Sequence, residues 1–489
     1  MNSGTSQGDI PRFRREGLVA AGLLALAVML AYANAWSVPF LFDDYATLRD
    51  NPALRAGWQP WAWVQPPAHT GVGGRPLAHL TLVLNHALTG DAVAGYHAGN
   101  LLLHLGAGWL FFGLVRRTLL LPILADHWKG RAGGWALAVA AVWLLHPVQT
   151  ASVTYLSQRT EVLMGLCYFG TLYGLVRGAA GSGRTGWLVF SVGCCVAGMA
   201  SKEVMVTAPV VALFYDRAFL AGSFREAWRR RGRWYLGLAS TWLLLLLLLP
   251  GLGGRGVGFG RGMEWWEYSL REGRAIALYL ARTVWPQPLV FDYGVDFPVI
   301  GAPEWLGVGV VLLLGAAAVV GSWRRPTIGF LPLWFLVTLA PTSSVVPIPL
   351  QPIAENRAYL PLAAVAAALM LGAGAWAPRV GRMLGVLLTG ALIVLSLARN
   401  HTYRSDVAIW HDTVLKVPGN ARAHHNLGNA LREAGRLEEA ERAFLAALAL
   451  RPDYAEAVAA LGGVLGRMGR VDDALRQSRR ALELDAQLP

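Results

Sequence analysis

Cysteine and charge are both scarce in this chain of 489 residues. Its three cysteines, Cys167, Cys194 and Cys195, all fall within apolar segments, which argues against a disulfide framework and against a metal site built on cysteines. Charged residues make up 15% of the chain and hydrophobic residues 55%, whereas soluble domains carry about 25% charged residues. The composition therefore predicts a membrane protein.

Acidic residues are outnumbered by basic ones, and the formal net charge is +13. After Asn400, however, the chain holds twelve Lys and Arg and twelve Asp and Glu. The whole excess thus lies in the apolar part, where it marks the loops that face the cytoplasm. No soluble module is basic enough to suggest nucleic acid as a partner.

Eleven apolar runs predict eleven transmembrane helices. The first, from Leu18 to about Ala35, follows Arg12, Arg14 and Arg15, and we interpret it as a retained membrane anchor. A cleaved signal peptide is the alternative, because Ala31-Tyr-Ala33 resembles a signal-peptidase site. The other runs lie near residues 97–115, 133–146, 162–176, 186–200, 203–216, 234–250, 305–322, 327–341, 358–377 and 383–398.

Basic residues cluster in alternate loops between these runs, which places those loops in the cytoplasm. The alternation holds only if the segment from Arg274 to Val290, which Arg282 and two prolines interrupt, forms a re-entrant or interfacial helix. The N-terminus is then cytoplasmic, and four long loops share the outer face, at residues 36–96, 146–161, 251–303 and 341–357. The basic clusters are Arg116, Arg117, Lys129 and Arg131; Arg177 and Arg184; Arg225, Arg229, Arg230, Arg231 and Arg233; Arg324 and Arg325; and Arg379 and Arg382.

From Asn420 the chain repeats itself with a period of 34 residues, in the tetratricopeptide pattern. Residues 405–416 are typical of the second helix of an incomplete preceding repeat. We therefore predict a transmembrane domain at 1–400 and an extracytoplasmic repeat domain at 401–489, with repeats at about 420–453 and 454–487. So short an array either docks a peptide or protein acceptor or only stiffens or dimerises the protein. The recurring pairs are Leu427 and Leu461, Gly428 and Gly462, Gly435 and Gly469, Ala440 and Ala474, and Leu448 and Leu482.

Two adjacent carboxylates, Asp43 and Asp44, follow the first apolar run. Near a bilayer surface such neighbours repel each other and lose hydration, so a pKa shifts or a cation pairs with them. That environment suits a general base. The alternative is that both residues only open a hydrated loop or cap a following helix.

Polar groups in the other outer loops are costly near a bilayer unless they pair or line a cavity. His97 and His104 share one helix face with Asn100, which fits either a metal site or satisfied interior histidines. An Arg such as Arg357 suits a phosphate ester, because the guanidinium binds it through two parallel hydrogen bonds. The candidate substrate-binding residues are Arg75, His97, His146, Arg159, Glu161, Lys202, Glu203, Glu355, Arg357 and Tyr359.

Two of these candidates have simpler explanations. Glu161 falls at the start of an apolar run and so also suits a plain helix N-terminal charge. Beside Lys202, Ser201 also suits a helix cap.

In order and spacing, these motifs resemble the transmembrane and tetratricopeptide-repeat O-mannosyltransferases and their bacterial relatives, in the GT-C superfamily. The resemblance covers nearly the whole chain and implies an all-α, polytopic membrane protein of the GT-C type with a C-terminal α-solenoid. The matching segments are Phe42-Asp-Asp44, Arg75-Pro-Leu77, His97 with Asn100 and His104, His146-Pro-Val148, Gln158-Arg-Thr-Glu161, Ser201-Lys-Glu203, Pro341-Thr-Ser-Ser344, Glu355 with Arg357 and Tyr359, and the repeats.

The same resemblance implies that Asp43 and Asp44 supply the catalytic carboxylate. The reaction it implies is transfer of a hexose, with mannose favoured, from a polyprenyl-phosphate carrier to a hydroxyl of an extracytoplasmic protein, with inversion. The expected location is a bacterial inner membrane, in contact with membrane lipid. The resemblance implies no definite cofactor requirement, and a divalent metal stays open, because some GT-C enzymes use one and others do not.

Two other functions remain open at this stage. One is a non-enzymatic scaffold, in which the spans only anchor the repeats. The other is a transporter of lipid-linked sugars, but the polar residues gather on the outer face, whereas a transporter needs them on both. Only about two repeats are present where the animal relatives have long arrays, so the part the repeats play in acceptor choice stays open too.

Overall fold

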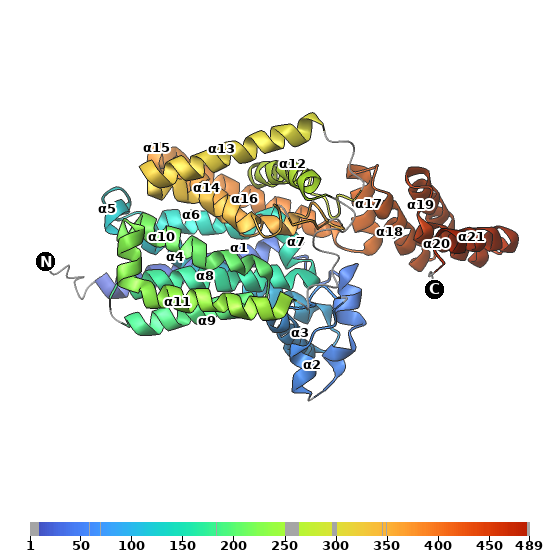
Figure 1. Ribbon diagram of the computed structural model, residues 1–489, viewed down its shortest axis with the longest axis horizontal. Helices are drawn as coiled ribbons and strands as arrows, with labels where there is room; N and C mark the ends of the chain where they lie inside the picture. Colours follow the sequence, from blue (N-terminus) through green and yellow to red (C-terminus); the bar gives the residue numbers. More distant parts are fainter. Residues whose placement is uncertain are drawn as a thin grey trace.

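The structure is a computed structural model, and it describes residues 9–57, 59–68, 70–181, 183–249, 264–295, 301–344, 346–348 and 350–486. These residues form helices and turns and contain no strand. A bundle of long helices adjoins a stack of shorter ones at the C-terminal end (Figure 1). The predicted all-α class is confirmed. Part of the expected outer loop 251–303 lies outside the described residues.

All eleven apolar runs overlap with helices of the bundle. These helices are α1 (Asp9–Ala31), α4 (Val93–Leu119), α6 (Ala132–Leu145), α8 (Arg159–Ala179), α9 (Arg184–Met199), α10 (Ala208–Tyr215), α11 (Phe224–Leu248), α13 (Ala302–Arg324), α14 (Pro326–Leu339), α15 (Pro361–Trp376) and α16 (Pro378–Thr402). Five further helices lie in the connections: α2 (Pro60–Val64), α3 (Pro76–Thr89), α5 (Pro122–Trp128), α7 (Thr150–Val153) and α12 (Trp265–Val284).

Helix length gives a smaller number of membrane spans than the count of apolar runs does. Five stretches of the described chain are long and apolar enough to cross a membrane, or six if the bent pair Ala132–Leu145 and Pro147–Val153 forms one span. Three more apolar helices, α9, α14 and α15, have 14 to 16 residues. At 1.5 Å per residue these three are shorter than the hydrocarbon core of about 30 Å. Eleven spans therefore stay a prediction.

Glycines bring neighbouring helices into close contact. A Cβ added to Gly174 of α8 would lie 2.8 Å from the backbone of α9, and one added to Gly307 of α13 would lie 2.4 Å from Gly273 of α12. Inside a membrane, such close van der Waals packing holds helices together where the hydrophobic effect cannot.

The helix α12 occupies the segment expected to be re-entrant or interfacial. Its buried face includes Tyr268, Glu272 and Tyr279, whereas Trp265 and Trp266 at its start are exposed. It packs against α13 and is not among the stretches long and apolar enough to span. An amphipathic helix of this kind suits the edge of a membrane.

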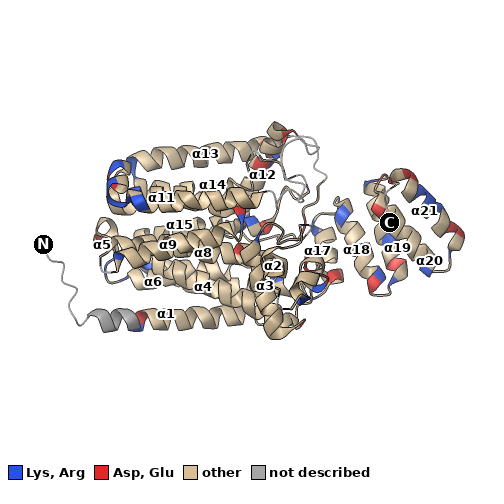
Figure 2. Ribbon diagram, turned by 60° about the horizontal axis from the view of Figure 1, so that its bottom comes forward, with Lys and Arg blue, Asp and Glu red and all other residues tan. Residues whose placement is uncertain are grey.

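The basic loops gather at the end of the bundle where α1 begins, which we call the Arg15 end (Figure 2). Contacts join neighbouring loops there: Arg116 pairs with Glu16 at 2.6 Å, and Arg184 donates to the carbonyl of Arg230 at 2.8 Å. We call the opposite end, where the chain leaves α1, the Asp43 end. The repeats adjoin this second end (Figure 1).

Five helices form the C-terminal stack: α17 (Asp406–Lys416), α18 (Ala421–Glu433), α19 (Leu437–Leu450), α20 (Ala455–Arg467) and α21 (Val471–Leu484). The side chains of Ser405 and Asn420 cap α17 and α18 by accepting backbone N–H groups. Gly435 and Gly469, with φ of 76° and 80°, form the turns within the two helix pairs, where other residues would be strained. The single helix α17 therefore precedes two helical hairpins, as the period predicts.

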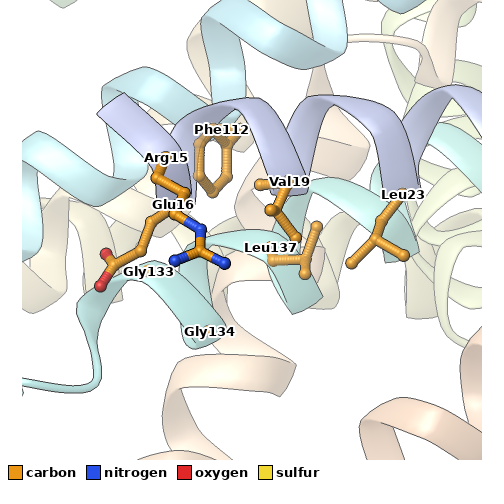
Figure 3. A pocket seen from close by; sticks show the side chains of 9 residues that line it. Arg15, Glu16, Val19, Leu23, Phe112, Gly133, Gly134 and Leu137 are labelled. Carbon is orange, nitrogen blue, oxygen red and sulfur yellow. The ribbon is translucent and has the colours of Figure 1, made fainter. Parts of the chain in front are cut away.

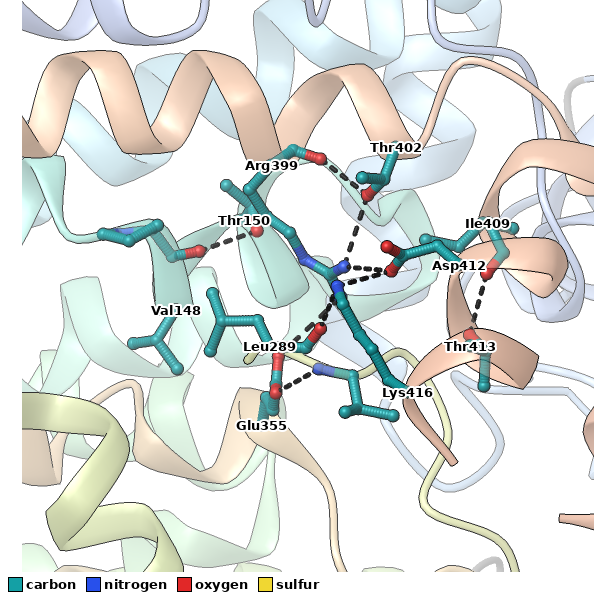
Figure 4. Close-up of polar contacts among 12 residues, drawn as sticks. Val148, Thr150, Leu289, Glu355, Arg399, Thr402, Ile409, Asp412, Thr413 and Lys416 are labelled. Carbon is teal, nitrogen blue, oxygen red and sulfur yellow. Dashed lines mark hydrogen bonds and ion pairs between the residues drawn. The ribbon is translucent and has the colours of Figure 1, made fainter. Parts of the chain in front are cut away.

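The stack is docked on the bundle through polar contacts at the Asp43 end (Figure 4). Lys416 of α17 donates to the carbonyl of Leu289 at 2.7 Å, and Arg399 of α16 pairs with Asp412 of α17 at 3.0 Å. One apolar core also continues from Leu41 and Tyr155 into the repeats. The repeats are thus fixed to the loops of the bundle.

Candidate active site

The two adjacent carboxylates lie in different surroundings. Asp44 is 1% exposed, and its two oxygens accept the backbone N–H groups of Ser157 at 2.7 Å and Leu41 at 3.2 Å. The Asp43 side chain is open to solvent, while its backbone N–H donates to the Tyr155 hydroxyl at 3.1 Å. Asp44 precedes the short helix η1 (Tyr45–Arg49) without a capping hydrogen bond. Asp44 therefore braces the turn, and Asp43 is the carboxylate that can meet a substrate.

Burial changes the acidity of both groups. It raises the pKa of Asp44 to about 7. The protein crowded around Asp43 also removes part of its hydration and raises its pKa, and the Asp292 carboxylate adds to this rise, while Tyr155 and the Arg422 guanidinium oppose it. A carboxylate with a raised pKa is a stronger proton acceptor than an ordinary one.

The residue before Asp43 has a strained backbone. Phe42 has a φ of 46°, in the left-handed region that bulky residues avoid. Its ring packs edge-on against Trp410 of α17, with 5.2 Å between the ring centroids, and against Phe291 at 6.4 Å. These aromatic contacts hold the strained turn in place.

Four of the candidate substrate-binding residues come together in a second polar cluster. Lys202 pairs with Glu161 at 2.5 Å, and Arg75 binds both oxygens of Glu203 at 2.8 and 2.9 Å. Asn356 donates to Glu161 at 3.2 Å and to Gln158 at 2.9 Å. Gln158 follows Ser157, which binds Asp44, so a continuous polar path joins this cluster to the carboxylate pair.

The structure tests the simpler explanations that the sequence left open for Glu161 and Ser201. Glu161 does lie in the first turn of α8, yet it also pairs with Lys202. Ser201 does not cap the next helix, because its hydroxyl donates back to the carbonyl of Ala197 at the end of α9.

Two predicted arginines are bound entirely by protein. Arg159 is 1% exposed and donates to the side chains of Asn100 and Asn85 and to the carbonyls of Thr81 and Tyr96. Arg357 is buried and donates to the carbonyls of Pro352 and Gln351. Arg159 therefore joins α8 to α3 and α4, and Arg357, which lies 3.7 Å from Glu272, links its loop to α12.

The predicted histidines and Tyr359 also lie inside the bundle. His97 contacts the carbonyl of Val38 at 2.9 Å, and His104 contacts the Tyr359 hydroxyl at 2.9 Å and the carbonyl of Leu144 at 3.0 Å. His146 accepts the backbone N–H of Val148 at 3.3 Å. His104 and His146 thus have the contacts of satisfied interior side chains, whereas the buried Nδ1 of His97 has no hydrogen-bond partner among the described residues. Within the described parts of the chain, no three His, Cys, Asp or Glu residues are grouped so that they could hold a metal ion.

Glu355 lies at the junction with the repeats. Its carboxylate accepts the backbone N–H of Val290 at 2.6 Å and the Tyr293 hydroxyl at 3.0 Å, and Arg399 lies 3.9 Å away. Burial raises its pKa. Figure 4 shows it beside the contacts that join α16, α17 and the loop after α12.

Sequence reasoning missed several residues around Asp43. Asp292 binds Arg422 of α18 through two hydrogen bonds of 2.6 Å, and Phe291 and Trp410 surround Phe42. The available signal was the Phe291-Asp-Tyr293 triplet in an outer loop, which resembles Phe42-Asp-Asp44 in composition. Nothing in the sequence pairs Asp292 with a residue 130 positions later.

A groove of about 400 Å³ lies along the Arg15–Leu23 part of α1, beside α4 and α6 (Figure 3). It is lined mainly by apolar side chains, with Arg15 and Glu16 at its edge. None of the predicted site residues lines it.

Known proteins are similar to this chain both in the repeats and in the bundle. Residues 419–487 match the family model described as tetratricopeptide repeat. Protein O-mannosyl-transferase TMTC1 of Homo sapiens is 24% identical over 538 residues, covering 93% of this chain and 58% of that protein. Protein O-mannosyl-transferase Tmtc1 of Drosophila melanogaster is 32% identical over 197 residues, covering 38% and 21%. The chain is similar to the tetratricopeptide-bearing protein O-mannosyl-transferases.

These relatives are longer than the region they share with this chain. The matched part spans about a fifth of the Drosophila melanogaster protein and under three fifths of the human one. Among solved structures, ArnT from Cupriavidus metallidurans, bound to undecaprenyl phosphate, is 14% identical, with a TM-score of 0.40, and the match covers 94% of this chain and 76% of that one.

Proposed function

We propose that this chain is a membrane glycosyltransferase that moves a hexose, with mannose favoured, from a polyprenyl-phosphate carrier to a hydroxyl of a protein. The observation that carries the proposal is the solvent-open Asp43 with its raised pKa, beside a buried Asp44 that fixes the turn. The similarity to proteins named O-mannosyl-transferases supports the same reaction class and favours mannose.

In the proposed reaction Asp43 removes the proton of the acceptor hydroxyl. The hydroxyl oxygen forms a bond to the anomeric carbon of the sugar while the bond from that carbon to the carrier phosphate breaks on the opposite face. The configuration is therefore inverted, the electron pair leaves with the phosphate, and the proton stays on Asp43 until water removes it. A general base placed in this way contributes about 10²- to 10⁴-fold to the rate.

The leaving phosphate needs positive charge more than it needs a proton. Lys202 and Arg75 are the predicted cations that lie in the polar cluster linked to Asp44, each paired with a carboxylate, whereas Arg159 and Arg357 lie outside this cluster and donate to amide or carbonyl oxygens. Glu161 and Glu203 hold the two cations in place before the donor arrives. We assign the donor phosphate to this cluster.

We propose further that the Asp43 end faces the extracytoplasmic side. The basic loops gather at the Arg15 end, and the positive-inside rule assigns that end to the cytoplasm (Figure 2). The carrier's tail then stays in the bilayer while the acceptor reaches Asp43 from water. For a bacterial cell the location that we propose is the inner membrane.

The test compares Asp43→Asn with Asp50→Asn in cells that lack the native chain. Asp50 lies on the same loop, is exposed and pairs with Arg49, so its replacement is a matched control. Mass spectrometry of extracytoplasmic proteins measures hexose on Ser and Thr. We expect Asp43→Asn to lower this modification at least about 10²-fold and Asp50→Asn to leave it near the parent level.

The scaffold alternative makes the opposite prediction. If the repeats alone carry the function, removal of residues 401–489 abolishes it while Asp43→Asn, inserted at normal levels, changes nothing. Full hexose modification with Asp43→Asn would reject Asp43 as the base.

A further inference from the structure

Two residues of the Asp43 turn, Phe42 and Tyr45, contact helix α17 of the C-terminal stack. Phe42 packs on Trp410 of α17, with 5.2 Å between ring centroids. The Tyr45 hydroxyl donates to the carboxylate of Asp406 at 2.5 Å. Asp43 lies between these two residues in the chain, and the positive charge of Arg422, at the start of α18, lowers its pKa. The turn is therefore held by α17 and α18 as well as by the bundle.

Arg422 is itself fixed by the bundle. Its guanidinium makes two hydrogen bonds of 2.6 Å to Asp292 and one of 2.7 Å to the carbonyl of Leu350. The side chain of Asn420 donates to the backbone carbonyl of Asp292 at 2.9 Å. These contacts tie the first repeat to two separate loops and fix the guanidinium, whose charge acts on Asp43.

From this geometry we infer that the repeats complete the catalytic centre rather than act as a separate docking arm. Trp410 and Asp406 position the strained turn that carries Asp43, and Arg422, which Asp292 holds in place, adds a positive charge that acts on Asp43. The inference rests on the proposed function for its meaning, since Asp43 is the base of that reaction. The contacts themselves belong to the full-length chain whatever sugar it transfers.

The titratable groups that influence Asp43 come from four parts of the chain. Asp44 lies beside it in the turn, Tyr155 follows α7, Asp292 lies after α12, and Arg422 belongs to α18. The positive charge of Arg422 lowers the pKa of Asp43, and the negative charge of Asp292 raises it. Removing one or the other must therefore change the acidity of Asp43 in opposite directions.

The experiment titrates Asp43 directly in the detergent-purified full-length protein. A water-soluble carbodiimide labels carboxyl groups only in their protonated form, and mass spectrometry of peptide fragments separates Asp43 from Asp44. We expect the pH midpoint of Asp43 labelling to rise by about one unit in Arg422→Ala and to fall in Asp292→Asn. Arg422→Lys, which keeps the charge, should stay near the parent midpoint. Arg442→Ala, an exposed position on α19, should not change it.

A purely structural role would give a different result. Loosening the junction would move both Arg422→Ala and Asp292→Asn in the same direction, and an Arg422 remote from Asp43 would move neither. Either outcome overturns the inference. Because labelling needs no donor or acceptor, opposite shifts in a protein that transfers no hexose would reject the proposed function and leave the positioning role standing.

Discussion

The interior of the bundle and the turn at its Asp43 end both hold charged groups. In the interior these groups are bound by other protein groups, whereas at the turn one of them is open to solvent. Inside, Arg159 and Arg357 give their hydrogen bonds to protein oxygens and His104 contacts a hydroxyl and a carbonyl. At the turn, Asp43 is open to solvent beside a second carboxylate and a strained Phe42. Buried polar groups whose hydrogen bonds go to protein oxygens thus hold the fold together, whereas Asp43 is left available to a substrate.

The physical reason is the cost of removing a charge from water. A buried guanidinium is tolerable when every N–H finds an acceptor, and it then joins helices that no hydrophobic effect would hold together. A carboxylate at the edge keeps part of its hydration and part of its reactivity. Its raised pKa is the consequence of that intermediate position.

The largest effect should come from removing a buried arginine whose hydrogen bonds hold the bundle together. Arg159→Leu leaves the oxygens of Asn100 and Asn85 without their donor, and we expect a loss of about 3–5 kcal/mol in the free energy of unfolding. Thermal unfolding in detergent measures it, with the exposed Arg404→Leu as the control. Transfer per folded molecule should stay unchanged. A stable Arg159→Leu protein without activity would show that Arg159 takes part in the reaction.

A smaller effect should follow at the turn. Trp410→Leu keeps an apolar side chain but loses the edge-on contact with Phe42, so the turn loosens. We expect transfer to fall about tenfold, with a loss of about 1–2 kcal/mol in stability. Steady-state kinetics measure the change. Phe444→Leu, in the core of the repeats but away from the turn, is the control and should lower stability without this loss of transfer per folded molecule.

The smallest effect concerns Asp44. Its folded pKa of about 7 lies above the unfolded value of 3.8, so its contribution to stability is complete below about pH 4 and is lost as pH rises through 7. In Asp44→Asn this part of the pH dependence should vanish, at a cost of about 1 kcal/mol for the hydrogen bond that an amide cannot accept. Unfolding temperatures across pH 4 to 8 measure it. An unchanged slope would show that Asp44 stays ionised in the folded protein.

Much of the architecture was readable along the chain. Apolar runs predicted where bundle helices form, because a membrane helix must be apolar over its own length. The 34-residue period predicted the helical hairpins, since each repeat carries its own turn glycine, Gly435 or Gly469. The Asp43-Asp44 pair was also visible, because two neighbouring carboxylates after an apolar run are a local pattern.

The tertiary structure alone decided how the polar residues divide. Arg159 and Lys202 look equally suited to a phosphate in the sequence, yet one is bound by neutral side chains and carbonyls and the other pairs with Glu161 in the cluster linked to Asp44. The contact between Asp292 and Arg422 crosses 130 residues and joins the bundle to the repeats. A sequence shows that a buried charge must find a partner. Which partner it finds depends on packing between distant segments, and that packing leaves Asp43 open while it closes around Arg159.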